Sequence, residues 1–276
     1  MSTTSRERFS ELVRANTDTT AALRLDLALL LIAAETLVDD DATGRALDGF
    51  IKDSVDLLDG LAERVPAHGR DDQRLRTALA DFIGQPSDYG RLESSLLPAV
   101  LRRRRGLPIL LSCVWTEVAR RVDIPAYGVG LPGHFVVGVG DPDGNRLLVD
   151  PFAGGRLLPY DDARAITERS GRALRPEQLR PQDPIAIIWR VLTNIGNWAS
   201  TPERSKHRLW SIELALALPH HDVRLRRERG EALAAVGRYS EASQELEDYA
   251  DTVEAAMPLE AQNARLVALQ ARARRN

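Results

Sequence analysis

The sequence predicts an α+β protein with a helical N-terminal part, a core that holds a small antiparallel sheet, and a helical repeat region. Three observations indicate this class. Segments rich in leucine and alanine dominate the first hundred residues, strand-like runs occur only between residues 126 and 150, and glycines at the spacing of helical repeats follow residue 183. We therefore expect two domains, residues 1–182 and 183–276.

Length and composition limit the classes of protein to which the chain can belong. A chain of 276 residues can bury a substantial core without disulfides. Its 37 basic and 40 acidic residues give a net charge of −3, which argues against a nucleic-acid-binding protein. The single cysteine excludes an internal disulfide framework and a cysteine-cluster metal site. We predict no metal, no cofactor and no nucleic-acid partner.

The N-terminus indicates no targeting segment. Residues 1–8 are polar, and the longest apolar run that follows them, residues 27–34, is far shorter than the roughly 20 residues needed to span a bilayer. That run fits a buried helix. We therefore expect a cytoplasmic protein without a membrane partner.

Three helices are expected in the first part of the chain. Residues 21–35 consist of strong helix formers, and residues 47–65 place apolar side chains at the spacing of an amphipathic helix. The acidic stretch Asp39–Asp41 is suited to a helix start, where the macrodipole favours negative charge. A further helix over residues 75–82 is ended by the glycine and proline that follow it.

The middle of the chain changes character. Pro108 precedes an expected helix over residues 109–122, and proline is favoured at a first helical position. Short strand-like runs follow this helix, and the last two flank the turn sequence Gly140-Asp141-Pro142-Asp143-Gly144. The three expected strands cover residues 126–130, 134–139 and 146–150.

The expected hairpin suggests a pair of polar side chains. A symmetric turn centred on Pro142 places His134 opposite Asp150, and direct cross-strand neighbours have Cβ atoms about 5 Å apart. An aspartate at that distance holds an imidazole in one tautomer and stabilises its protonated form. The alternative is that His134 caps a strand while Asp150 opens the turn at Pro151.

From Asp183 onward the chain is expected to be helical. Asp183 suits an N-cap, and Pro184 suits the first helical position. Small and aromatic residues at the spacings of a tetratricopeptide unit follow, and two of the glycines lie 34 residues apart, which is the period of that repeat. These residues are Gly196, Gly230, Gly237, Tyr239 and Ala242. The alternative is a generic helical hairpin.

Two repeats are fewer than the three that usually make a stable array, because each hairpin leaves an apolar stripe to be covered. Either the core or a partner then covers the stripe. Residues 264–275, a helix-forming segment with several arginines, suit a solvated terminal cap.

Four stretches of the middle region form a recognisable set: Arg103-Arg104-Arg105-Gly106-Leu107-Pro108-Ile109, Val118-Ala119-Arg120-Arg121, Gly128-Val129-Gly130-Leu131-Pro132-Gly133-His134-Phe135 and Asp150-Pro151-Phe152-Ala153-Gly154-Gly155. Together they resemble the SirB-type bacterial family, which has a transglutaminase-like core. The resemblance spans roughly residues 25–160 and is most specific in these stretches. It implies a papain-like α+β core followed by tetratricopeptide-like repeats. It also implies that His134 and Asp150 match the histidine and aspartate of the superfamily's Cys-His-Asp triad.

The third member of that triad is where the sequence departs from the superfamily. A nucleophilic cysteine there begins the helix before the sheet, where the helix dipole and the free N–H groups favour a thiolate. The matching position in this chain falls at or next to Pro108, which has no nucleophilic atom. The resemblance implies that the SirB-type family shares this substitution.

Cys113 is the only thiol and lies about five residues inside the same helix. Without the dipole end to activate it, we expect it to be buried as a small hydrophobe, with a nucleophilic role as the alternative. Ser112 is a weaker nucleophile candidate because a hydroxyl needs an adjacent base. Glu117 is a possible buried partner for Arg121.

Two charged or ligating runs remain open to interpretation. The four arginines Arg102–Arg105 suit either a solvated surface or an anion-binding site. His220-His221 follows Pro219 in an expected turn, without a second ligand pair for a metal.

We favour the interpretation that the chain is a transglutaminase-fold protein that lacks the standard nucleophile. It would act as a binding or regulatory module, with a protein or peptide partner at the C-terminal repeats. The alternative is an amide or peptide hydrolase, or an acyl transferase. It would use His134 oriented by Asp150, with Cys113 or an activated water as the nucleophile. A third possibility is a small-molecule pocket with acid–base chemistry.

Overall fold

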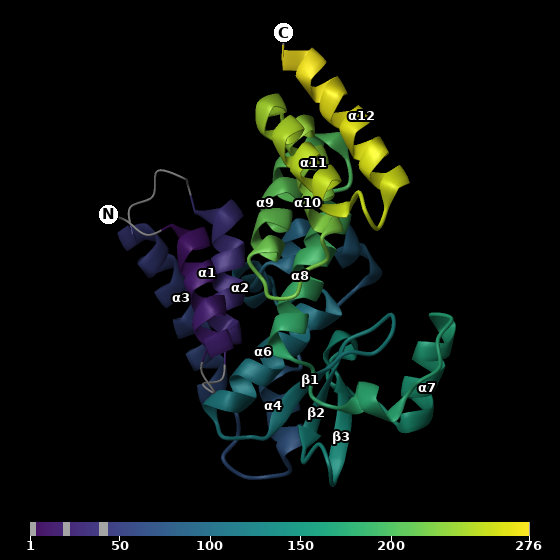
Figure 1. Ribbon diagram of the computed structural model, residues 1–276. Coiled ribbons are helices and arrows are strands. Elements are labelled where there is room, and N and C mark those ends of the chain that lie inside the picture. The colour runs from purple at the N-terminus through teal and green to yellow at the C-terminus, as the bar shows by residue number, and fades with distance from the viewer. Residues whose placement is uncertain (1–3, 19–22, 39–43, 276) are drawn as a thin grey trace. The chain divides into compact units, whose positions relative to one another are not determined.

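The computed structural model describes residues 4–18, 23–38 and 44–275 (Figure 1). The expected helix start at Asp39–Asp41 lies outside these residues. The chain divides into two compact units, residues 1–8 with 21–191 and residues 9–20 with 192–276, and each is described by itself. The predicted boundary after residue 182 stays a prediction.

The first unit is built mainly from helices, as predicted. The expected helices over residues 47–65 and 75–82 are present with shifted ends, and the one over residues 21–35 is present within the described residues. The helices of this unit are α2 (Leu25–Leu37), α3 (Gly44–Glu63), α4 (Asp71–Leu79), α5 (Leu97–Arg103), α6 (Pro108–Arg121) and α7 (Tyr160–Arg169), with the short turns η1 (Pro86–Gly90), η2 (Leu92–Ser95), η3 (Pro151–Ala153) and η4 (Pro176–Leu179). Helices α1 (Ser5–Asp18) and α8 (Pro184–Trp198) each have residues in both units.

Helices α2 and α6 form the centre of the first unit. Residues 28–34 of α2 are all buried, as expected for a helix that is apolar on every side. Pro108 occupies the first turn of α6, as predicted, and most of the residues after it are buried. Helix α6 packs against α3, β1 (Ala126–Val129) and β2 (Val136–Gly140), so it links the helices to the sheet.

The sheet is antiparallel and has four strands in the order β1-β2-β3-β4. Besides β1 and β2 it contains β3 (Arg146–Asp150) and β4 (Arg156–Leu157). The sequence predicted the first three strands. It missed β4, because two exposed residues give no alternating pattern.

The predicted register of the hairpin is wrong: the turn is centred one residue later, so each cross-strand partner lies two residues further along the chain. Gly138 pairs with Leu148 and Gly140 with Arg146, so the turn is centred on Asp143 and not on Pro142. Gly140 belongs to β2 because its φ of 103° is accessible to glycine, and a Cβ there would lie 2.5 Å from a backbone oxygen. In this register His134 is not the cross-strand partner of Asp150, and it lies in the turn before β2.

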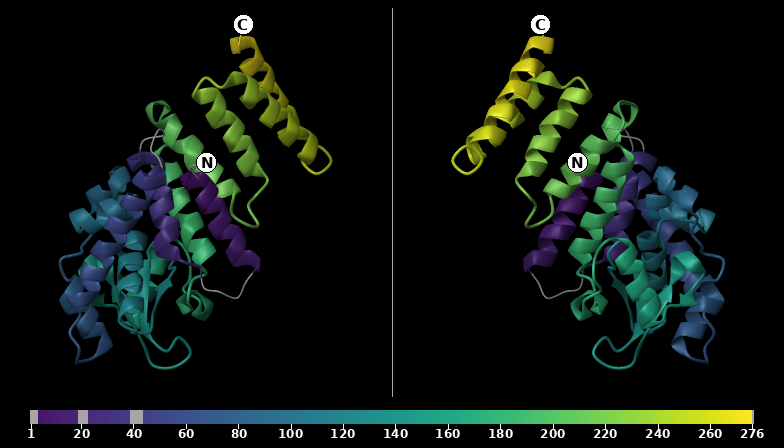
Figure 2. Two further views of the ribbon diagram at one scale, coloured as in Figure 1. Left: turned by 90° about the vertical axis from the view of Figure 1, so that its left-hand side faces the viewer. Right: turned by 90° about the vertical axis from the view of Figure 1, so that its right-hand side faces the viewer.

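The second unit is a series of paired helices, visible side by side in Figure 2. After the end of α8 and a short turn, η5 (Pro202–Arg204), these helices are α9 (Ser205–Leu216), α10 (Arg224–Ala235), α11 (Tyr239–Val253) and α12 (Pro258–Arg275). Each packs against the next one along the chain. The predicted helical repeats are confirmed.

Small residues allow the close approach of these helices. A Cβ on Gly230 of α10 would lie 2.6 Å from Leu246 Cγ on α11, so this position accommodates only glycine without a shift. The same role on α12 is taken by Ala261, Ala264 and Ala268, which are fully buried together with Tyr249. Within the described ranges, no helix has both the length and the apolar character that a bilayer span requires.

Candidate functional site

His134 and Asp150 lie together at one end of the β2–β3 hairpin. His134 Nε2 is 3.0 Å from Asp150 Oδ2, and the histidine side chain is 12% exposed. A tight turn presents the histidine, since its N–H donates to the Leu131 carbonyl at 3.1 Å and Gly133 has a φ of 77°. The two side chains are therefore adjacent as expected, but the turn before β2 brings them together and not the strand pairing.

Asp150 is fixed on both sides of its carboxylate. Its Oδ1 accepts the backbone N–H of Phe152 at 3.0 Å and so caps η3, while Oδ2 faces the imidazole. Its backbone oxygen accepts from Gly155 at 2.9 Å. Asp150 therefore makes both contacts that the sequence suggested: it is the histidine's partner, and it opens the turn at Pro151.

This arrangement fixes the histidine tautomer. When Nε2 donates to Asp150, Nδ1 is left with a lone pair and can accept a proton. Oriented in this way, the imidazole can act as a general base toward a group beside Nδ1. The catalytic role of His134 and Asp150 stays a prediction.

Aromatic rings form one wall beside the pair. The His134 and Phe152 rings meet edge to face with centroids 6.0 Å apart, and Tyr89 lies 6.3 Å beyond Phe152. Gly84 allows Phe152 to lie in this position, because a Cβ on that glycine would come within 2 Å of the ring. The sequence did not indicate Tyr89 or Phe152 as site residues.

Arg190 of α8 holds the histidine turn from the other side. Its Nη2 donates to the His134 carbonyl at 2.9 Å, both terminal nitrogens lie 3.4 Å from the Leu131 carbonyl, and its guanidinium lies 5.3 Å from the centre of the Phe135 ring. No sequence pattern indicated Arg190 as a site residue. The available signal was an arginine between the buried apolar residues Ile188 and Val191.

Cys113 is buried inside α6, 1% exposed, as expected for a core residue. Burial raises the pKa of its thiol far above the ordinary value, and Glu117 adds to this effect. The thiol is therefore protonated at neutral pH, and a protonated thiol is a poor nucleophile. Ser112 is also buried, with its hydroxyl directed at the Phe135 carbonyl at 3.5 Å.

Glu117 and Arg121 form the expected ion pair, with Arg121 Nη1 2.9 Å from the carboxylate. Arg121 also contacts Asp26 at 3.1 Å and Asp59 at 2.7 Å. Asp26 is fully buried, and burial raises its pKa while hydrogen bonds from Arg24 and Arg121 lower it, with a net decrease. This network holds α2 and α6 together and has a structural role.

The run Arg102–Arg105 is largely neutralised by acidic residues. Arg103 and Arg105 both contact the fully buried Asp88, at 3.3 and 3.2 Å, and Arg104 pairs with Asp81. Asp88 also accepts from the Gln85 N–H and the Ser94 hydroxyl, so it anchors η1, η2 and the end of α5. These contacts favour a structural role for the run over an anion-binding one.

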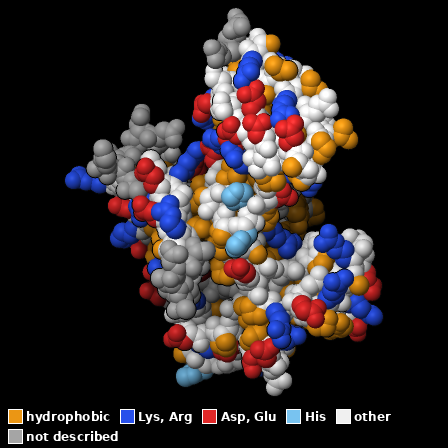
Figure 3. Space-filling view, in the orientation of Figure 1, with side chains coloured by type: hydrophobic (Ala, Val, Ile, Leu, Met, Phe, Trp, Pro, Cys, Tyr) orange, Lys and Arg blue, Asp and Glu red, His pale blue; other side chains and the backbone are white. Residues whose placement is uncertain are grey.

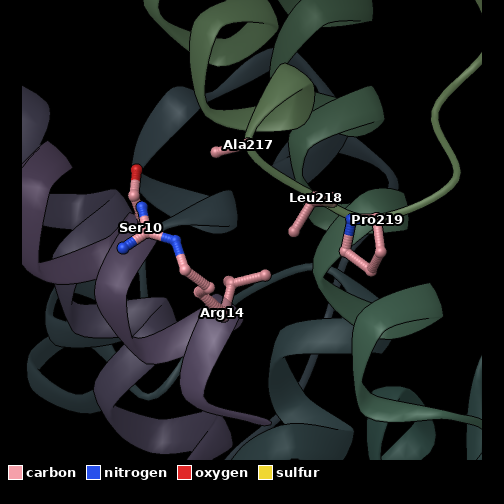
Figure 4. A pocket seen from close by; sticks show the side chains of 6 residues that line it. Ser10, Arg14, Ala217, Leu218 and Pro219 are labelled. Atoms are coloured by element: carbon pink, nitrogen blue, oxygen red, sulfur yellow. The ribbon is translucent and has the colours of Figure 1, made fainter. Parts of the chain in front are cut away.

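The pair His220-His221 lies in the turn after α9, where His220 has a φ of 59° and His221 Nδ1 lies 3.0 Å from the Leu218 carbonyl. Across the described ranges, no three His, Cys, Asp or Glu side chains are grouped to hold a metal ion. A pocket of about 280 Å³ near this turn is lined by α1 and by residues 217–219 (Figure 4). Arg14 is the one charged residue of its lining, and it supplies no acid–base pair.

Comparison with known proteins gives the class of each part. A family model described as the transglutaminase-like superfamily matches residues 54–193, and a tetratricopeptide-repeat model matches residues 195–274. The chain therefore belongs to the transglutaminase-like superfamily and carries tetratricopeptide repeats.

Its relatives place it in a narrower group. A UPF0162 protein of Xylella fastidiosa is 31% identical over 232 residues, 80% of each chain, and one of Pseudomonas aeruginosa is 34% identical over 61% of this chain and 62% of its own. The protein SirB1 of Salmonella typhimurium is 29% identical over 39% of this chain and 43% of its own. The chain is a member of this UPF0162 or SirB-type family. No solved structure matches it.

Proposed function

We propose that this chain is a binding module of the cytoplasm, whose repeat region takes up an amphipathic helix of a partner protein. The observation that carries the proposal is the outer face of α12. Leu259, Leu266 and Leu269 on that helix are 77%, 53% and 56% exposed, and Figure 3 shows hydrophobic side chains on the surface of the C-terminal helices. Their spacing of seven and three residues places them on one face of the helix.

The opposite face of α12 explains why a helix is the expected occupant. Ala261, Ala264 and Ala268 pack against α11, so α12 has one buried and one exposed apolar face. A helical array normally ends on a polar outer face, because the terminal repeat has no neighbour to cover it. A further helix with apolar residues at three- and four-residue spacing extends the same α11–α12 stacking.

The core supports binding over thiol chemistry. Its one cysteine is buried and its thiol pKa is raised, while Pro108 occupies the helix start at which the superfamily's nucleophile is expected. In this proposal the core is a pseudoenzyme, which retains the fold and the histidine–aspartate pair without a working thiolate.

A second candidate function is supported by the hydrogen bond between His134 and Asp150. An imidazole held by a carboxylate can remove a proton from water as the water attacks an amide carbonyl, and can then return that proton to the leaving amine. This chemistry describes a hydrolase without a cysteine. It requires substrate and water beside the imidazole.

The binding proposal is tested by selecting helical peptides from a displayed library on the full-length chain. We expect the selected peptides to share apolar residues at three- and four-residue spacing. Their affinity should fall at least about tenfold, or 1.4 kcal/mol, in a Leu266→Glu and Leu269→Glu double variant.

Leu157→Glu is the matched control, because Leu157 is 40% exposed in the first unit and the same change there should leave the affinity intact. If the chain self-associates and the double variant abolishes this self-association, the occupant of the α12 face is a second copy of the chain and not a partner's helix. That result would overturn the proposal. Equal binding to the wild-type chain and the double variant would also overturn it. Hydrolysis of test amides that is lost in Asp150→Asn and kept in Cys113→Ala would favour the second candidate.

A further inference from the structure

We infer that Arg190, together with Tyr89 and the His134 ring, forms a binding site for a ligand that carries a carboxylate. This site lies entirely within the first unit and is independent of the helix proposed to bind at α12. It assigns to the core a ligand class, a carboxylic acid, that neither the family nor the histidine–aspartate pair specifies.

The charge of Arg190 is the main evidence. Its hydrogen bonds go to two backbone carbonyls, and its other contact is the face of Phe135. Across the part of the chain that the structure describes, no carboxylate lies within ion-pair distance of this guanidinium. By contrast, Arg121, which is comparably enclosed, contacts three carboxylates.

A partly buried cation without an anion is unfavourable. Burial lowers the pKa of Arg190, which shows that its surroundings disfavour the charged form. Because arginine still stays protonated at neutral pH, the charge is retained and remains available to a ligand anion. A carboxylate that binds it forms a charge-assisted and potentially bidentate pair, which is stronger than the 3.4 Å contacts to Leu131 that it would replace.

Tyr89 places a hydroxyl donor in the same region. Burial raises the pKa of Tyr89, and the charges of Arg190 and Asp150 act on it in opposite directions, so its hydroxyl lies within electrostatic range of both. Its residue surface is 56% exposed, so this side of the site is open to solvent. Arg190 and Tyr89 thus supply donors for a carboxylate near the His134 turn, and the His134 ring offers a contact for the polar group next to that carboxylate.

The glycines before the histidine turn leave room for this arrangement. A Cβ on Gly130 would lie 2.3 Å from the Gln182 side-chain oxygen and 3.5 Å from Arg190 Nη1. The Gln182 N–H also donates to the Gly128 carbonyl at 2.9 Å, which fixes the chain just before α8. Gly130 thus makes room for the Gln182 side chain just before α8, while a Cβ there would make only an ordinary contact with Arg190.

The test uses matched acid and amide probes on the full chain, with the His134 ring signals followed by NMR. His134 is one of five histidines, so a His134→Gln variant assigns its signals. N-acetylalanine is the acid and N-acetylalaninamide is the neutral control. We expect a saturable shift of the His134 signals with the acid and binding of the amide that is weaker by at least about tenfold.

Arg190→Gln should remove the acid's advantage, Arg190→Lys should keep part of it, and Arg102→Gln should keep all of it, because Arg102 is an exposed arginine of the neutralised run. Short peptides with free or amidated C-termini then distinguish a peptide C-terminus from a free small acid as the source of the carboxylate. The wild-type chain alone can overturn the inference: equal shifts of the His134 signals with the acid and the amide, or no shift with either probe, would do so. An undiminished preference for the acid in Arg190→Gln would overturn the role of Arg190.

Discussion

The two units of this protein differ in where charged side chains are buried and in how strongly large apolar side chains are exposed. In the first unit, polar groups such as Asp26, Asp88 and Asp150 are buried and held by several hydrogen bonds. In the second, the packed faces are mainly apolar and rich in alanine, while Leu259 and Leu266 remain exposed. Buried, satisfied polar groups fix the geometry of a core, whereas an exposed apolar face binds a partner.

Within the core, the histidine–aspartate pair and the thiol also differ in their access to solvent. The imidazole and carboxylate are partly reachable from solvent, while the thiol of Cys113 is enclosed and its pKa is raised. A transglutaminase-like fold has thus kept acid–base groups near the surface and placed its one thiol in the interior. This contrast is why the repeats, and not the thiol, carry the proposed function.

The largest expected effect comes from removing a buried anion. Asp88→Ala leaves Arg103 and Arg105 without their shared carboxylate, and breaking such a buried pair costs about 3 kcal/mol of unfolding free energy. Asp81→Ala is the control, because Asp81 is 34% exposed and its pair with Arg104 is worth about 1 kcal/mol at most. Urea unfolding measures both variants, and equal losses would refute the anchoring role of Asp88.

A matched pair of glycines tests packing in the repeats. Gly230→Ala should destabilise by about 1–3 kcal/mol, because the new methyl group collides with Leu246. Gly196→Ala should be neutral or stabilising by up to about 1 kcal/mol, because the methyl would meet only the Ser211 hydroxyl at 3.6 Å and alanine favours the helix. Thermal unfolding of the full chain gives the order, and the reverse order would contradict the packing described here.

The pH dependence of stability tests the Asp26 network. The folded pKa of Asp26 is lowered, so its contribution is present above the unfolded value of about 3.9 and is lost as pH falls through the folded value. We expect Asp26→Asn to be less stable than the wild type at pH 6 and the difference to shrink below about pH 4. A difference that stays constant between pH 6 and pH 3 would show that charge is not what Asp26 contributes.

The smallest expected effect belongs to Cys113. Cys113→Ala removes one buried sulfur and should cost about 1 kcal/mol of stability, without a change in the binding of a selected helical peptide. Peptide titration and urea unfolding check the two halves of this expectation. Loss of peptide binding without loss of stability would give the thiol a functional role.

The sequence was sufficient for features that local patterns encode. Pro108 at the start of α6 and the helical repeats around Gly230 follow from residue type and spacing. The proximity of His134 to Asp150 follows from the family resemblance, since the spacing argument assumed a register that the sheet does not have. The register between β2 and β3 did not follow, because it depends on the backbone angle of Gly140. A sequence pattern does not reveal whether a glycine ends a strand or extends it.

The rest of the site depends on contacts between distant segments. Tyr89 and Arg190 are a hundred residues apart, and neither forms a motif with His134. Arg190 contacts the histidine turn from α8, which follows a segment held to the sheet by the hydrogen bond from Gln182 to Gly128. Such side chains are identified from the fold and not from spacing.

The reactivity of Cys113 in the native protein tests most directly the central claim that the core has no working thiolate. The measurement is the rate of alkylation by iodoacetamide between pH 6 and pH 9, with the urea-unfolded chain as reference. The account predicts native labelling at least about 1,000-fold slower than in the unfolded chain, because the thiol reacts only when the core opens. Rapid native labelling with a midpoint well below pH 8.5 would contradict the account and identify an activated nucleophile.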